Sequence, residues 1–112
     1  ASLSYSIFTD SHLEFASLVG ADLQRSEFDD AHMEYAKLDK SKLWNASLKG
    51  TYLQNASLVE ADLEGALLDG AHLEGADLTG AIGLTAKQIN SATFNDETKL
   101  PAYFSRPKKQ NG

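Results

Sequence analysis

The sequence of 112 residues contains no cysteine and no long hydrophobic run. Without cysteine, a disulfide framework and thiolate chemistry are both excluded. No apolar stretch approaches the ~18 residues of a membrane-spanning helix, and no signal-peptide pattern is present. A glycine-rich phosphate loop, the spacing of a Ser–His–Asp triad and a zinc-binding motif are also missing. These absences favour a protein that is not an enzyme, binds no cofactor and does not contact a membrane.

Acidic residues outnumber basic ones, and the two kinds are unevenly placed along the chain. The formal net charge is −6. Residues 1–80 carry fourteen Asp or Glu and five Lys or Arg, a net of −9, whereas residues 81–112 carry a net of +3. An acidic body disfavours direct binding of nucleic acid, which depends on neutralisation of phosphates. It favours basic partners, or it simply confers solubility.

The strongest pattern in the sequence is a period of five residues. Five is the period of neither an α-helix nor a flat strand. A small residue stands two positions before each apolar one, so both share one face of a short extended segment, and the next two residues can form a turn. The pattern predicts a solenoid whose stacked repeats share one core. The sixteen apolar positions are Leu3, Phe8, Leu13, Leu18, Leu23, Phe28, Met33, Leu38, Leu43, Leu48, Leu53, Leu58, Leu63, Leu68, Leu73 and Leu78.

A longer period of twenty residues indicates how many sides each coil has. When the chain is aligned in rows of twenty, Phe8 falls above Phe28 and all three histidines fall in one column. Coils of four repeats place similar residues directly above one another, whereas coils of three or five repeats would place them on different sides. We therefore expect an all-β solenoid of about four coils, each with four sides. The histidine column contains His12, His32 and His72, with Tyr52 in the remaining row.

Three repeats, beginning at Ala21, Ala61 and Ala76, match the pattern A-(D/N)-L-x-x most closely. In these repeats and in their spacing, residues 1–82 resemble the pentapeptide-repeat family. The resemblance implies a right-handed quadrilateral β-helix with four repeats per coil. Glycine ends all four repeats of the last coil, whereas the early coils depart from the family pattern. Because glycine permits positive φ at corners, we expect tighter and more uniform turns in the last coil than in the N-terminal half.

The period ends at Gly83, and the residues after it predict a cap. Thr85 and Gln88 form a capping-box pattern. We therefore expect a short α-helix over residues 86–92, within a cap of residues 83–104 that covers the open end of the last coil.

The rest of the C-terminal region is expected to lack regular structure. Residues 93–101 are predicted to form an irregular loop in which Phe94 and Leu100 pack back on the core. Residues 105–112 are predicted to be a flexible basic tail. The C-terminal ending resembles that of cyanobacterial and chloroplast pentapeptide-repeat proteins. The sequence does not specify a compartment, and a soluble protein of the cytoplasm, the periplasm or the thylakoid lumen is expected.

No comparable cap precedes the first coil. The chain does not begin with Met, and residue 1 is already in phase with the repeats. We favour a missing preceding segment over the two alternatives, which are a bare first coil and self-association through this uncapped coil.

The histidine column is the best candidate for a ligand-binding site. His12 and His32 are expected about one coil spacing apart, ~4.8 Å, on the outside of one face, with Glu14 and Glu34 flanking them. Histidine and glutamate are suitable ligands for a transition metal. However, an inward-pointing residue separates each histidine from its glutamate, and a flat, solvated face lacks the convergent ligands that a metal site needs. We therefore favour a surface ladder produced by repetition of the coil, and we predict no metal.

Outward-facing aromatic residues in the N-terminal half are the candidate interaction surface. Exposed aromatic side chains mark some protein-binding surfaces, but packing between adjacent coils at the corners also accounts for them. Phe8 and Phe28 are instead expected to stack inside the core. The surface candidates are Tyr5, Phe15, Tyr35 and Trp44.

The sequence supports three hypotheses of function. The leading one is a small, rigid, non-enzymatic module that presents a surface to an unknown protein partner or acts structurally in a larger chain. The second is implied by the family resemblance alone, since some pentapeptide-repeat proteins mimic duplex DNA and bind type II topoisomerases. The acidic charge agrees with it, whereas the shortness of the rod and its interspersed cations disagree. The third is surface metal binding by the histidine column.

Overall fold

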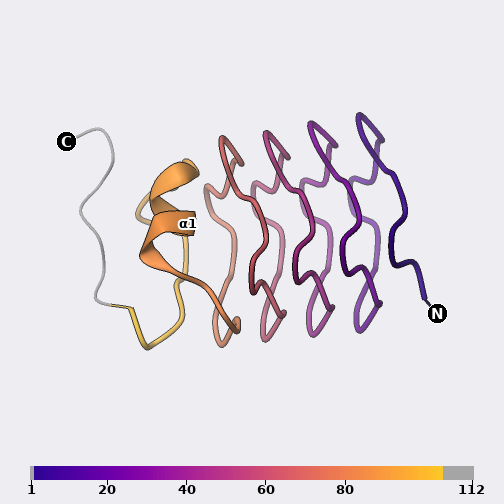
Figure 1. Ribbon diagram of the computed structural model, residues 1–112. Helices are drawn as coiled ribbons and strands as arrows, with labels where there is room; N and C mark the ends of the chain where they lie inside the picture. Colours follow the sequence, from indigo (N-terminus) through magenta and orange to yellow (C-terminus); the bar gives the residue numbers. More distant parts are fainter. Residues whose placement is uncertain (1, 105–112) are drawn as a thin grey trace.

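The computed structural model describes residues 2–104 and shows a right-handed quadrilateral β-helix that is closed at one end by a helix (Figure 1). Coil 1 contains residues 2–20, and coils 2, 3 and 4 contain residues 21–40, 41–60 and 61–80. Among the described residues, the strands are single-residue parallel bridges and the helical element is α1, Ala86–Ser91. This architecture confirms the predicted four-sided solenoid.

Backbone hydrogen bonds connect each coil to the next. For example, the Leu23 amide donates to Lys42 O at 2.8 Å, and the Lys42 amide donates to Ala21 O at 2.9 Å. Parallel bridges join residues twenty positions apart and define four faces. Face 1 contains Ser2, Asp22, Lys42, Asp62 and Ile82; face 2 contains Ile7, Glu27, Ser47 and Leu67; face 3 contains His12, His32, Tyr52 and His72; and face 4 contains Ser17, Lys37, Ser57 and Asp77.

The apolar residues of the five-residue period fill the interior of the β-helix. From Leu23 to Leu78 these residues are fully buried, whereas those of coil 1 are only partly buried because coil 1 lies at the open end. Phe8 and Phe28 stack with ring centroids 5.0 Å apart, as predicted. From Ser26 onward the small residue of each repeat is also buried, and the hydroxyls of Ser26 and Thr51 donate from this position to backbone carbonyls of the preceding coil. Thr51 Oγ1, for instance, donates to Phe28 O at 2.7 Å.

The turns of the N-terminal half are as regular as those of the last coil, so the expected difference between them is wrong. The last residue of each repeat has a left-handed φ whether it is glycine or not, as in Phe15 (φ 64°), Tyr35 (φ 63°) and Gly75 (φ 71°). A left-handed residue costs about 1–2 kcal/mol when it carries a Cβ atom. The ladder of inter-coil hydrogen bonds imposes this conformation on every repeat and offsets that cost.

A cap closes the C-terminal end of the β-helix, and α1 begins where the sequence predicts (Figure 1). Thr85 is the N-cap residue, and it forms a capping box with Gln88. The expected irregular loop after α1 is wrong in part, because Thr93 and Lys99 form parallel bridges with His72 and Asp77. These bridges extend faces 3 and 4 beyond coil 4. Phe94 is buried and Leu100 packs against the core, as expected.

Two sequence predictions about the chain ends remain predictions. The prediction of a flexible basic tail concerns residues 105–112, which lie outside the described residues. Self-association through coil 1 is likewise not tested by the structure of a single chain. Within residues 2–104, α1 is far too short to traverse a bilayer, and no other segment forms a long apolar helix.

Candidate functional site

The four aromatic surface candidates lie at two different corners of the β-helix. Tyr5 and Trp44 lie at the corner between faces 1 and 2, whereas Phe15 and Tyr35 lie at the corner between faces 3 and 4. In a four-sided coil these two corners are diagonally opposite. The candidates therefore form two separate surfaces rather than one.

An arginine completes the corner between faces 1 and 2. Arg25 Cζ lies 5.9 Å from the ring centroid of Tyr5 and 5.5 Å from that of Trp44. These distances are within the range of cation–π interactions. Tyr5 is 66% exposed, and the neighbouring Ile7 on face 2 is 71% exposed. We call Tyr5, Ile7, Arg25 and Trp44 the aromatic–cationic corner.

Sequence reasoning missed the contributions of Arg25 and Ile7 to this corner. The twenty-residue alignment contained the necessary signal for Arg25, because it places Arg25 directly after Tyr5 in one column. Ile7 is an outward residue of face 2 in the same coil as Tyr5. An apolar residue at an outward position of the repeat is the corresponding signal for Ile7.

The opposite corner carries a simple aromatic pair. The rings of Phe15 and Tyr35 stack with centroids 5.1 Å apart and an interplanar angle of 5°. The two residues are 73% and 51% exposed in spite of this contact. Packing between coils, one of the two explanations considered for the outward aromatics, is thus present without removing the rings from solvent.

The histidine column forms a continuous stack of rings along face 3. His12 and His32 are parallel with centroids 4.8 Å apart, and His32 and Tyr52 are parallel with centroids 4.5 Å apart. Tyr52 in turn stacks on His72 at 4.7 Å. The predicted spacing of one coil is confirmed, and the stack restricts rotation of the central rings.

The histidines and glutamates approach each other more closely than the sequence suggests. His12 Nδ1 lies 3.3 Å from Glu14 Oε2, and His32 Nδ1 lies 3.7 Å from Glu34 Oε2. The expectation that the intervening inward residue keeps these ligands from converging is therefore wrong. Each glutamate stands at the turn after face 3, from which its side chain reaches back along the face.

The electrostatics of Glu14 reflect this geometry. A hydrogen bond from its own backbone amide, followed by the contact with the His12 side chain, holds the pKa of Glu14 below its ordinary value. Glu14 is consequently ionised at neutral pH.

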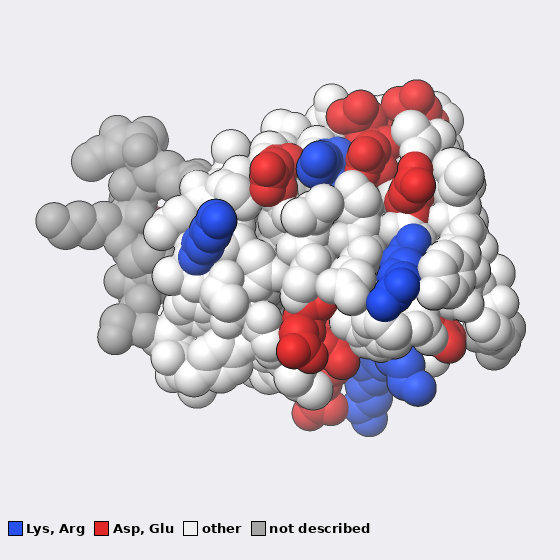
Figure 2. All heavy atoms as spheres, viewed as in Figure 1, with Lys and Arg blue, Asp and Glu red and all other residues white. Residues whose placement is uncertain are grey.

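Negative charge is interspersed with positive charge over the surface. On the face seen in Figure 2, Asp and Glu side chains gather along the upper edge, with Lys and Arg side chains beside them and lower down, and the acidic side chains do not form one continuous band over this face. Some carboxylates also have structural roles, since Ser47 Oγ donates to Asp29 at 2.5 Å and Ser57 Oγ donates to Asp39.

A groove lies between α1 and coil 4. Its volume is about 360 Å³, and its lining includes Leu67, Leu68 and Gln88. The charged residues of the lining are Asp69 and Lys87. This lining contains neither a nucleophile–base pair nor paired carboxylates of the kind used in acid–base catalysis.

Comparison with known proteins identifies a family. The family model described as pentapeptide repeats (8 copies) matches residues 6–45 and 46–82. A search among curated proteins found no significant match.

Two of the similar proteins with solved structures are pentapeptide repeat proteins from cyanobacteria. The pentapeptide repeat protein Rfr23 from Cyanothece 51142 is 30% identical with a TM-score of 0.73, and the match covers 88% of this chain and 63% of that one. HetL from Nostoc sp. strain PCC 7120, involved in heterocyst differentiation regulation, is 30% identical with a TM-score of 0.71, with coverage of 88% and 44%. This chain thus spans less than two thirds of either protein.

QnrB1, a plasmid-mediated fluoroquinolone resistance protein, is a more distant match. It is 16% identical with a TM-score of 0.51, and the match covers 91% of this chain and 61% of that one. At this identity the similarity concerns the fold alone.

Proposed function

Because the chain belongs to the pentapeptide-repeat family, we propose that it is a non-enzymatic interaction module that binds a protein partner through the aromatic–cationic corner. The observation that carries this proposal is the stack of Tyr5, Arg25 and Trp44 over three successive coils. Tyrosine, arginine and tryptophan are the residue types most enriched in the energetic centres of protein interfaces.

The corner has the physical properties of a preorganised binding surface. Its three stacked side chains are attached to a hydrogen-bonded β-helix, so little conformational entropy is lost when a partner binds. The exposed side chain of Ile7 adds apolar area beside the stack. Removal of this apolar area from water favours association.

The rest of the surface supports a non-enzymatic role. The outer faces of a four-sided rod are flat or convex, whereas catalytic groups need a concave site that excludes water. The groove beside α1 is concave, but Asp69 and Lys87 are the charged side chains in its lining. Interaction through an exposed corner therefore agrees with the geometry better than catalysis.

Site-specific photo-crosslinking tests this proposal. A photoreactive amino acid replaces Ile7 in one variant and Val19 in a control variant. Val19 is also exposed, but it lies at the corner between faces 4 and 1. We expect a partner to be crosslinked from position 7 and not from position 19. Equal crosslinking from both positions would contradict the proposal.

A binding measurement with the purified partner completes the test. Arg25→Glu should weaken the affinity at least about tenfold, equivalent to about 1.4 kcal/mol. Lys37→Glu makes the same change of charge in the same coil but on face 4, and it should leave the affinity unchanged. If both variants weaken binding equally, general electrostatic attraction rather than the corner determines the interaction.

A further inference from the structure

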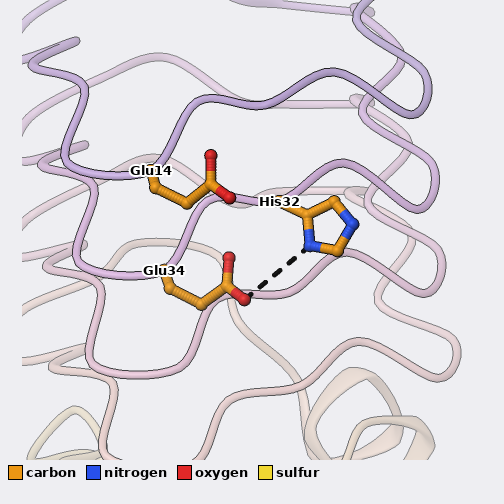
Figure 3. A group of neighbouring side chains, drawn as sticks. All are labelled: Glu14, His32 and Glu34. Atoms are coloured by element: carbon orange, nitrogen blue, oxygen red, sulfur yellow. Dashed lines mark ion pairs between the residues drawn. The ribbon is translucent and has the colours of Figure 1, made fainter.

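Coils 1 and 2 bring three potential metal ligands together at the edge of face 3. Glu14, His32 and Glu34 each offer one ligand atom, and all three atoms lie within 4.8 Å of one another. Figure 3 shows the two carboxylates extending from adjacent coils toward the imidazole, with His32 Nδ1 facing Glu34. The ligands come from both members of a stacked pair of coils, so the backbone bridges fix their relative positions.

The imidazole is held in place before any ligand binds. The ring of His32 lies between the parallel rings of His12 and Tyr52, at centroid distances of 4.8 Å and 4.5 Å. This stacking fixes the plane of the ring, and the contact of Nδ1 with Glu34 Oε2 at 3.7 Å directs that nitrogen toward the glutamates. Glu14 is oriented in turn by His12, whose Nδ1 lies 3.3 Å from its carboxylate. Metal sites depend on such supporting contacts, which orient the ligands and raise the affinity.

The chemistry of the three groups fits a divalent transition metal. One imidazole nitrogen and two carboxylates form a mixed nitrogen–oxygen ligand set, and the two negative charges neutralise a divalent cation. Bonds of about 2.0–2.2 Å to zinc place tetrahedral ligands about 3.4 Å apart. The observed separations are at most 4.8 Å, so they require a contraction of up to about 1.4 Å, and the long glutamate side chains can provide it by small rotations.

We propose that Glu14, His32 and Glu34 form a surface site for one divalent transition-metal ion, such as zinc, with water in the remaining coordination positions. The side chains of His32 and Glu34 are 35% and 31% exposed, so an ion has access from solvent. With three ligands on an open face, we expect affinity in the micromolar range. The site lies at the corner diagonally opposite the aromatic–cationic corner, so the proposal is independent of the proposed function.

The lower half of the same column is a natural control. Forty residues further along the chain, the corresponding positions hold Gln54, His72 and Glu74. One of the two carboxylates is thus replaced by a neutral amide, which is a poor metal ligand. His72 Nδ1 also lies 3.5 Å from the Thr93 hydroxyl. The proposal therefore predicts one ion per chain, and the alternative of an inert ladder predicts none.

Calorimetric titration with zinc chloride tests the proposal on the tag-free chain. The unmodified protein should bind one ion, and Glu34→Gln should weaken binding at least tenfold. Glu74→Gln makes the same change in the lower half and should leave binding intact. Far-UV circular dichroism without metal verifies that both variants are folded. Equal heats for the unmodified protein and Glu34→Gln would overturn the proposal.

A gain of binding provides a second, independent measurement. Gln54→Glu completes the same set of three ligands with His72 and Glu74, two coils further along. We expect this variant to bind two zinc ions instead of one. The ¹⁵N chemical shifts of the imidazoles should report coordination at His32 in both proteins and at His72 in the variant alone. Failure of Gln54→Glu to bind a second ion would show that this geometry does not suffice for coordination.

Discussion

The turn positions differ in how strongly a side chain destabilises the fold. Tyr5, Phe15 and Tyr35 adopt the same left-handed conformation as the glycines of coil 4. Left-handed φ is therefore not by itself a reason for glycine in this protein. Glycine becomes necessary only where a neighbouring coil approaches the position of a Cβ atom.

Gly83 is such a position, and Gly83→Ala should destabilise the protein strongly. A Cβ atom at Gly83 would lie 2.8 Å from Glu64 Cα and 3.0 Å from Glu64 N. Because these are backbone atoms, rotation of a side chain cannot relieve the clash. We expect a loss of about 2–4 kcal/mol in the free energy of unfolding, measured by urea denaturation.

Gly20→Ala is the matched control for this substitution. Gly20 has a similar φ of 71°, but no atom lies within 4 Å of its Cβ position. Only the cost of the left-handed conformation remains, so the loss should be about 1 kcal/mol. Equal destabilisation by the two substitutions would show that the contact with Glu64 is not the cause.

At the scale of elements, α1 depends on contacts outside itself. A helix of six residues is not stable in isolation, because nucleation is costly. Ile89 anchors it in the core, and Gln88 connects it to the edge of coil 4. Gln88 Nε2 donates to Leu63 O at 2.9 Å and to Ala66 O at 2.8 Å, while Gln88 Oε1 accepts from the Thr85 amide at 2.7 Å.

Gln88→Glu separates the two roles of this side chain. A glutamate preserves the capping box, but it cannot donate to the two carbonyl groups and places negative charge beside them. We expect a loss of about 2–3 kcal/mol in the free energy of unfolding, measured by thermal denaturation at neutral pH. Lys87→Glu introduces negative charge at the exposed neighbouring position and should change stability by less than about 0.5 kcal/mol. A similar loss in both variants would indicate an effect of charge rather than of the lost hydrogen bonds.

The elements also show where sequence reasoning succeeds and where it fails. The coils and the start of α1 were predictable, because a strict period and a capping box are local patterns with one structural solution. The bridges of Thr93 and Lys99 were not predictable, because they follow offsets of 21 and 22 residues from their partners and so break the period.

For the candidate sites, the sequence predicted only which residues stack above one another in successive coils. The twenty-residue alignment placed His12 above His32 and Glu14 above Glu34, and the structure confirms this stacking. The alignment could not show that glutamate side chains reach back toward the imidazoles, because side-chain torsions at a turn do not follow from the period. For the same reason, the position of Arg25 over the two aromatic rings required the structure.

The whole molecule is acidic in composition, but basic residues lie among the acidic ones on its surface. Residues 1–80 carry a net charge of −9. On face 1, however, Lys42 is bridged on both sides to the acidic residues Asp22 and Asp62. On face 4, Lys37 precedes Ser57 and Asp77. Faces 1 and 4 therefore do not present the uninterrupted rows of negative charge by which a protein could imitate the phosphates of duplex DNA.

This arrangement predicts that the protein does not act on a type II topoisomerase as a mimic of DNA. In a gyrase supercoiling assay we expect no inhibition up to about 50 µM, a concentration at which even a weak micromolar complex would form. Lys42→Glu joins Asp22 and Asp62 into one acidic row without altering the core, since residue 42 is exposed. If the unmodified protein inhibits gyrase and Lys42→Glu inhibits more strongly, negative surface charge determines its activity. In that case DNA mimicry would replace recognition through the aromatic–cationic corner as the function of this β-helix.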